Sequence, residues 1–327
     1  MIQFLTDNID QLDLALDQLK MRDRNYDRFA ILLIDDVAEL TLHRYAQNEA
    51  KKHELLNDSG SLNNIPKSMR KALGQNFGDK VKFAFEQGLI DRYTSQSIIK
   101  LHSLRNTSYH QGLKHEKTLH SLAIFYFRNI CNLLKAYHPN YWEWSSSWKI
   151  SYRAVKYIGT SDLFANEPQL FIAAYNRLDE VAASFKEDLV GDLAADMQAL
   201  ISSVDKNIYF LAGYSTQKEK RDWAITFAQA YALCMSEDIE LIAKKLGYIP
   251  KVHKDTFDWL MKNYNWPIKH DPVPGWKLRY RSLVRETNYH VALKKYCDFI
   301  SQAKMLESSL EEAAAELDYQ LEMEWLF

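Results

Sequence analysis

The sequence predicts an all-α protein. Only 10 glycines and 7 prolines occur among 327 residues, together about 5% of the chain, where average usage gives about 12%. Apolar residues recur at steps of three and four, and no alternating pattern is long enough to require a strand. The scarcity of turn residues and the helical periodicity together favour long helices.

Length and composition predict two globular domains. A prior of about 150 residues per domain gives two for this chain. Apolar residues make up 47% and charged residues 26%, which allows a sizeable core and excludes a disordered chain. No secretion signal is visible, and the longest apolar segment, 29–34, is too short to cross a bilayer. A cytoplasmic protein that does not enter the membrane is therefore expected.

The cysteines and the net charge exclude several function classes. The three cysteines are odd in number, widely spaced and form no CxxC pair: Cys131, Cys234 and Cys297. Neither a disulfide framework nor a cysteine-based zinc site is suggested, and no cofactor or metal is expected. A net charge of −2 is not that of a generic nucleic-acid binder, so any such contact needs local basic patches.

A bundle of four or five helices is expected in the first part of the chain. The periodicity predicts helices over residues 1–20, 27–52, about 69–87, about 95–109 and 118–137. Asp36 interrupts the apolar stripe of the second, either as a helix-face charge or as a partner for an inward Arg. Residues 57–68 are rich in Asn, Ser, Gly and Pro and predict a loop. Gly88 is the expected helix stop, and Thr94 or Ser95 the expected N-cap of the next helix.

The run HPNYWEWSSSWKISY, residues 138–152, breaks the helical pattern. It places the domain boundary near residue 150, with domains 1–150 and 151–327. Its three tryptophans suggest aromatic packing between domains or a stacking surface for bases. Beyond it, periodicity predicts helices over 168–210, 217–246 and 253–265, then a loop and further helices to the end. The second domain is therefore also expected to be all-α.

The segment LRNTSYHQG, residues 104–112, carries the clearest chemistry. Ile98, Leu101 and Arg105 stand at i, i+3 and i+7, so the apolar stripe delivers a guanidinium at its end. Asn106 and His110 share a face, whereas Arg105 and His110 are about 140° apart around the axis. Arg and His converge only if the Arg side chain folds across, the helix ends between them, or a second copy supplies the other half.

This trio of side chains could cleave RNA without a metal. A histidine with a pKa near 6.5 can take the proton of a ribose 2′-OH or protonate the leaving 5′ oxygen. An arginine, always charged and fork-shaped, suits the extra negative charge of the phosphorane. The asparagine would orient the histidine or the phosphate. Taken alone, the spacing favours the alternative of a surface arginine and a satisfied histidine.

With Arg105, a polar Asn106, three variable residues and His110, the chain resembles the HEPN superfamily of small helical bundles. The resemblance covers residues 1–137 and includes the approach KVKFAFEQGLIDRYTSQSIIKLHS to the motif. It implies a HEPN-like bundle in which Arg105 and His110 are catalytic and Asn106 is supportive. Members of the family are mostly RNases of toxin–antitoxin, CRISPR and anti-phage systems that act as dimers with two motifs facing each other.

A second copy of the motif follows at an offset of 180 residues. RETNYHVALK, 285–294, is identical to RNTSYHQGLK, 105–114, at six of ten positions. An intact Arg285 and His290 suggest that one chain could hold both halves of a composite site, as an internal pseudo-dimer. The second domain would then be a divergent HEPN-like repeat. The alternatives are coincidence or a decayed site, because Glu286 in place of Asn would repel phosphate.

Two basic segments precede the two motifs and predict RNA-binding surfaces. The cations proposed to bind RNA are Lys67, Arg70 and Lys71 in the first segment and Lys277, Arg279 and Arg281 in the second. Solvated helix faces are the alternative for both. Three further histidines lack a metal-ligand spacing and are expected at the surface: His102, His115 and His120.

The sequence thus predicts an all-α protein, HEPN-like in its first domain, that acts as a metal-independent endoribonuclease leaving a 2′,3′-cyclic phosphate. A toxin or anti-phage effector is expected, with RNA, including tRNA, as substrate and an antitoxin or defence protein as partner. The functional site would form in a homodimer or in the pseudo-dimer. The alternatives are a non-catalytic helical module that binds nucleotides or a protein, and a regulatory subunit of a separate enzyme.

Overall fold

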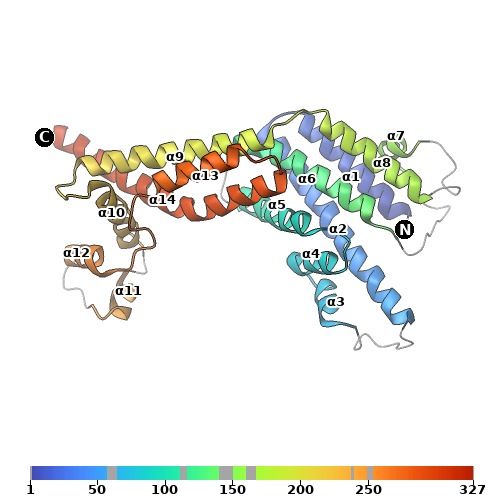
Figure 1. The fold of residues 1–327 in the computed structure, drawn as a ribbon, viewed down its shortest axis with the longest axis horizontal. Helices are drawn as coiled ribbons and strands as arrows, with labels where there is room; N and C mark the ends of the chain where they lie inside the picture. Colours follow the sequence, from blue (N-terminus) through green and yellow to red (C-terminus); the bar gives the residue numbers. More distant parts are fainter. Residues whose placement is uncertain are drawn as a thin grey trace. The chain divides into compact units, whose positions relative to one another are not determined.

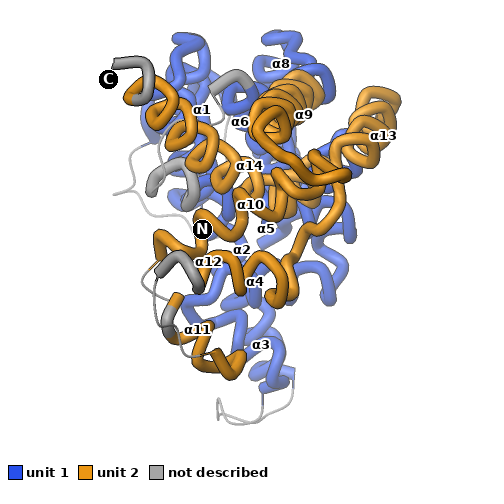
Figure 2. The backbone as a smooth tube through the Cα atoms, turned by 90° about the vertical axis from the view of Figure 1, so that its left-hand side faces the viewer, with its two compact units in different colours: residues 1–192, 288–294 blue, residues 193–287, 295–327 orange. Residues whose placement is uncertain are grey.

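The computed structural model describes residues 2–56, 65–110, 116–139, 150–159, 167–236, 239–248 and 253–326. Over these residues the chain forms helices and connections without a strand, so the all-α prediction is confirmed. No described helix is long and apolar enough to cross a membrane. The chain divides into two compact units, residues 1–192 with 288–294 and residues 193–287 with 295–327 (Figure 2).

Helices that pack side by side form the centre of the first unit. They are α1 (Ile2–Lys20), α2 (Arg24–Leu56), α6 (Glu116–Ala136) and α8 (Glu167–Ala183), and each packs against the next in that order (Figure 1). The buried face of α1 repeats every three to four residues, with Leu5, Ile9, Leu12 and Leu16 at most 2% exposed. The helix predicted over residues 1–20 is confirmed.

The helix expected over 69–87 is two helices, α3 (Lys67–Ala72) and α4 (Phe77–Glu86). Asn76 causes the break, because its Oδ1 accepts a hydrogen bond from the backbone N of Asp79 at 3.0 Å and caps α4. Gly88 ends this region as predicted. Its φ of +76° is the left-handed conformation, and Leu89 N then bonds back to the carbonyl of Ala84 at 2.9 Å.

The start of α5 (Arg92–His110) differs from the prediction that Thr94 or Ser95 would be its N-cap. Asp91 is the cap, since its carboxylate accepts a hydrogen bond from Thr94 N at 2.7 Å. That bond, among other hydrogen bonds, lowers the pKa of Asp91.

Residues beyond 150 continue the first unit. Helix α7 (Tyr152–Ile158) packs against α1 and α8, and Asp13 on α1 accepts bonds from Arg153 at 2.6 Å and Tyr157 at 2.6 Å. The division of the chain consequently falls after Asp192, later than the expected boundary near residue 150. The run 138–152 predicted to lie between domains is described only at its two ends, with 140–149 outside the described residues.

The second unit contains most of α9 (Leu189–Gly213) and α14 (Tyr289–Leu326), together with α10 (Lys220–Cys234), α11 (Ile239–Lys245), α12 (His253–Asn263) and α13 (Val273–Val284). Tyr296 on α14 donates to Asp196 on α9 at 2.6 Å, and Trp276 on α13 packs edge-on against Phe299 at 5.4 Å. A smaller apolar cluster joins α10, α11 and α12 around Trp266. The helix expected over 168–210 is broken near Lys186, whose φ is +53°.

Candidate functional site

The predicted motif lies on α5, and its apolar stripe faces inward. Ile98 is fully buried and Leu101 is 3% exposed. Arg105 follows four residues later on the same face, and its Nε lies 3.7 Å from Oδ2 of Asp35 on α2. The prediction that this stripe brings a guanidinium to the edge of the core is therefore confirmed.

Asp35 is the centre of the site, although the sequence pattern had pointed to its neighbour. The Asp35 side chain is 2% exposed and accepts hydrogen bonds from Tyr126 OH at 2.7 Å and from His102 Nδ1 at 2.9 Å. Burial and the adjacent Asp35 raise the pKa of Tyr126 well above its ordinary value, which keeps the phenol protonated and donating. Asp36 is a helix-face charge instead, bonded to Gln11 at 2.8 Å.

The prediction that His102 lies at the surface is wrong. Its side chain is 20% exposed and its ring stacks on Phe77 with centroids 3.9 Å apart and planes 9° from parallel. The signal that could have found it is its position three residues before Arg105, on the same face of α5. Its Nδ1 faces Asp35, so Nε2 is the ring atom left for proton transfer.

His120 was also expected at the surface and is instead 13% exposed. It bonds to Asp27 at 2.7 Å, and its second nitrogen lies 3.4 Å from Glu187. This pairing joins α6 to α2 and to the connection between α8 and α9, which is a structural role. The third histidine of that prediction, His115, lies outside the described residues.

The remaining motif residues are only partly described. Helix α5 continues through Asn106 to His110, so the motif lies in one uninterrupted helical segment. The side chains from Asn106 to His110 lie outside the described part of the structure. The described part of the site is thus a partly exposed guanidinium and a histidine, both beside one buried carboxylate.

The second motif has a different local structure from the first. Helix α13 ends at Val284 and Arg285 is its C-cap, whereas His290 lies in the first turn of α14. Asn288 causes this break, because its Oδ1 caps α14 by accepting from His290 N at 2.9 Å. The six identities between the two segments therefore do not correspond to a repeated helix.

The structure places Arg285 and His290 in different units of the chain. Arg285 is exposed. His290 bonds through Nδ1 to Ser97 on α5 at 2.8 Å and packs edge-on against Phe125 at 5.1 Å. Ser97 precedes Arg105 by eight residues, about 12 Å along a helix. Burial lowers the pKa of His290 below its ordinary value of 6.5, an effect that Asp91 partly opposes.

The first basic segment is divided between the surface and the interior. Lys67, Arg70 and Lys71 are all exposed on α3. Lys80, further along the same basic stretch, is 4% exposed and donates to Glu39 at 2.6 Å. The exposed cations of this stretch are those of α3 and Lys82 on α4, which lies 3.8 Å from Glu86.

The second basic segment is partly neutralised by acids and packing of its own unit. Lys277 Nζ lies 2.9 Å from Asp205, which also binds Arg221. Arg279 donates to Gln302 at 2.7 Å, and its guanidinium lies over the Phe299 ring at 5.5 Å. Arg281 is exposed.

Comparison of the chain with protein-family models, with curated proteins and with solved structures finds no match. Within the described residues, no group of three or more His, Cys, Asp or Glu side chains is arranged to hold a metal ion. The three cysteines are free thiols, and burial raises the pKa of Cys131.

Proposed function

We propose that this protein is a metal-independent endoribonuclease of the HEPN type, with its site at the C-terminal end of α5. The observation that carries the proposal is the pairing of a continuous motif helix with a buried acid. Helix α5 runs unbroken to His110, and Arg105 is held at its edge by Asp35 at 3.7 Å with 40% of its side chain exposed. A guanidinium so placed can reach a phosphate without leaving its helix.

Each side chain has a role that its chemistry allows. Arg105 would stabilise the extra negative charge of the phosphorane formed when the ribose 2′-OH attacks the adjacent phosphate. His110 would transfer the proton to or from the reacting oxygens, and Asn106 would orient it. His102, held by Asp35 at 2.9 Å, is a second candidate for proton transfer. The exposed cations of α3 would bind the RNA backbone.

The local structure of the second motif favours two copies of the chain over an internal pseudo-dimer. Because 285–290 spans a helix end, a turn and a new helix start, it does not reproduce the helical motif of α5. The partner half of a composite site would then come from a second protein copy. In this proposal the protein acts in the cytoplasm as a toxin or anti-phage effector, on RNA such as tRNA, under the control of an antitoxin or defence protein.

One observation favours a second candidate function, a non-catalytic helical module that binds nucleotides or a protein. Asp35 is a buried carboxylate, and a buried charge requires a partner. On this alternative Arg105 only compensates Asp35, and His102 completes the same network. The two candidates differ in whether Arg105 can be removed without loss of the fold.

The deciding experiment is cleavage of total RNA and of tRNA by the purified chain in EDTA. Wild type should cleave and leave 2′,3′-cyclic phosphate ends. Arg105→Ala and His110→Ala should each lose about 10²-fold or more in rate. The matched control is Arg92→Ala, an exposed arginine at the opposite end of α5, which should cleave at the wild-type rate. Circular dichroism on all four proteins checks the fold.

Three results would count against the nuclease. Strict dependence on a divalent ion would contradict the mechanism. Equal cleavage by Arg105→Ala would remove the guanidinium from the site. A folded wild type that leaves RNA intact would place the binding module first.

A further inference from the structure

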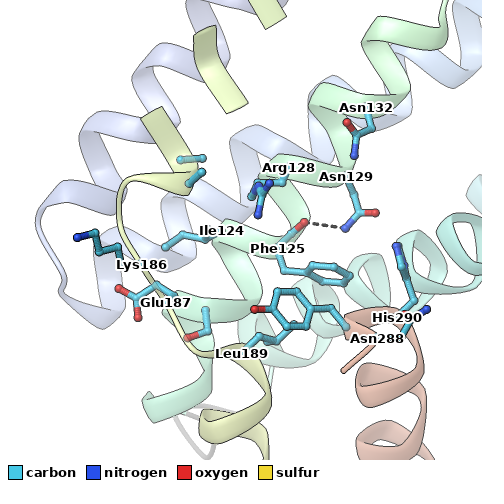
Figure 3. Close-up of a pocket in the computed structure, with 14 residues that line it drawn as sticks. Ile124, Phe125, Arg128, Asn129, Asn132, Lys186, Glu187, Leu189, Asn288 and His290 are labelled. Atoms are coloured by element: carbon cyan, nitrogen blue, oxygen red, sulfur yellow. Dashed lines mark hydrogen bonds between the residues drawn. The ribbon is translucent and has the colours of Figure 1, made fainter. Parts of the chain in front are cut away.

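A pocket of about 510 Å³ lies in the first unit, lined entirely by residues of that unit (Figure 3). One wall is a single face of α6 that includes Ser121, Phe125, Arg128 and Asn132, at steps of three and four. The other walls are the end of α8, the start of α9 and the first turn of α14. The volume is in the range of sites for small organic molecules.

The α6 wall offers hydrogen-bond donors that the described part of the protein does not use. Arg128 donates through Nε to Asp179 at 2.7 Å, and its side chain is 43% exposed. Its two terminal nitrogens have no partner in the described part of the chain. Asn129 uses Nδ2 for the carbonyl of Phe125 at 2.7 Å, drawn as a dashed line in Figure 3. A guanidinium fork with free donors is suited to bind an oxyanion.

The lining itself carries two cations, Arg128 and Lys186, against one acid, while Asp179 and Asp192 lie behind it on Arg128 and Ser121. Glu187 is the one acid in the lining, and it already lies 2.9 Å from Arg22. Lys186 stands at the rim with its ammonium turned outward in Figure 3. The long helix α14 begins at Tyr289 in this lining, so its positive end adds to the same field.

Next to the donors, the pocket has a wall of rings, formed by Phe125 on α6 and by Tyr289 and His290 at the start of α14. Phe125 and Tyr289 pack edge to face, with centroids 6.0 Å apart and planes at 78°. His290 also packs edge-on against Phe125 at 5.1 Å, and its lowered pKa keeps it neutral near pH 7. Flat, uncharged rings of this kind are a surface on which a nucleobase stacks, and Asn132 offers both an acceptor and donors to a base edge.

We propose that this pocket binds a nucleoside monophosphate, with the phosphate on Arg128 and the base against Tyr289. Such a ligand carries both groups that the lining can bind, an oxyanion and a flat aromatic ring with polar edges. The site is distinct from the Arg105 site, and the inference does not rest on the endoribonuclease proposal. It gives a role to Arg128, Asn129 and Asn132, three polar side chains that α6 contributes to the pocket.

Isothermal titration calorimetry on the intact chain in EDTA tests the proposal. The probes are AMP, GMP, CMP and UMP, with inorganic phosphate and adenosine as the two halves of the ligand. At least one nucleotide should bind at least tenfold more tightly than either half. Because binding is measured without RNA and without turnover, the result is independent of whether the chain cleaves RNA.

Variants assign the binding to the pocket. Arg128→Gln should weaken nucleotide binding by about tenfold or more, as loss of a charge-assisted bond does. Tyr289→Leu should weaken it by about fivefold or more through lost stacking. Lys186→Asn should weaken it only a few-fold, since its charge is at the rim; Asn is chosen because it tolerates the left-handed backbone at this position. Lys82→Gln, an exposed lysine on α4 of the same unit, is the matched control and should bind as wild type.

Several outcomes would overturn the assignment. Phosphate that binds as tightly as every nucleotide would show that the ring wall contributes nothing. Binding unchanged in Arg128→Gln and in Tyr289→Leu would place the ligand elsewhere. The same conclusion follows if the folded wild type binds no nucleotide at millimolar concentration. Should Arg128→Gln fail to fold, Tyr289→Leu decides, because Tyr289 is 38% exposed and its loss leaves the core intact.

Discussion

Two buried carboxylates of the first unit, Asp13 on α1 and Asp35 on α2, are satisfied in different ways. Asp13 receives Arg153 at 2.6 Å, Lys156 at 2.8 Å and Tyr157 at 2.6 Å, all from one short helix. Asp35 receives Tyr126 at 2.7 Å and His102 at 2.9 Å, but the Nε of its arginine remains 3.7 Å away. That separation exceeds hydrogen-bonding distance.

The two arginines differ in exposure and in how closely their carboxylates hold them. Burial alone would raise the pKa of Asp13, yet the bonds from Lys156, Tyr157 and Arg153 outweigh it and lower that pKa. Arg153 is 20% exposed and fixed by Asp13 and Asp17, whereas Arg105 is 40% exposed. An arginine that binds phosphate must keep donors accessible. Arg105 is twice as exposed as Arg153, which is the property that the proposed phosphate contact requires.

The largest expected effect on stability follows from breaking the ion pair between Arg153 and Asp13. Arg153→Ala should lower the free energy of unfolding by about 3 kcal/mol, because it breaks the pair with the buried Asp13. Urea unfolding measures this loss. Lys20→Ala removes a cation from the same Asp17 at an exposed position and should cost about 0.5 kcal/mol or less. A loss below about 1 kcal/mol in Arg153→Ala would mean that Lys156 and Tyr157 suffice for Asp13.

A smaller effect on stability is expected at the candidate site. Arg105→Ala should cost about 1 kcal/mol or less, because the pair is long and partly exposed and Asp35 keeps His102 and Tyr126. The same urea measurement applies, and Arg92→Ala on α5 is the control. A loss of about 3 kcal/mol, equal to that of Arg153→Ala, would make Arg105 a structural residue and favour the binding module.

The sequence predicts those parts of the structure that depend on neighbours along one helix. The stripe of Ile98, Leu101 and Arg105 is local, and the structure confirms that it ends in a guanidinium at the core edge. Gly88 is likewise confirmed as a helix stop, since its left-handed backbone is a local property.

The sequence pattern does not predict contacts between segments that are far apart along the chain. Asp35 and His102 are 67 residues apart, and no spacing rule relates them. Asp13 and Arg153 are 140 apart, which is why the aromatic run before residue 150 suggested a boundary that the contacts place after Asp192. The second motif shows the converse error, because identity at six positions did not outweigh the capping preference of Asn288.

The smallest expected effect concerns His290, which bonds to a hydroxyl where His102 bonds to a carboxylate. His102 bonds to Asp35, whereas His290 bonds to the hydroxyl of Ser97 and lies against Phe125 and Tyr93. Burial lowers the pKa of His290 below 6.5, and Asp91 opposes this only in part. The folded state thus binds this proton more weakly than the unfolded state, so stability is complete above pH 6.5 and falls as the pH decreases through that value.

His290→Asn removes the titrating ring and keeps a polar group that can pair with Ser97. Wild type should lose more unfolding free energy between pH 7.5 and pH 5.5 than this variant does, as measured by urea midpoints at the two values. His43, whose pKa burial also lowers, is present in both proteins and cancels in the difference. Equal losses would mean that His290 is solvated well enough to accept a proton in the folded state. The ring wall of the pocket would then carry a charge at mildly acidic pH, and nucleotide binding should become tighter there.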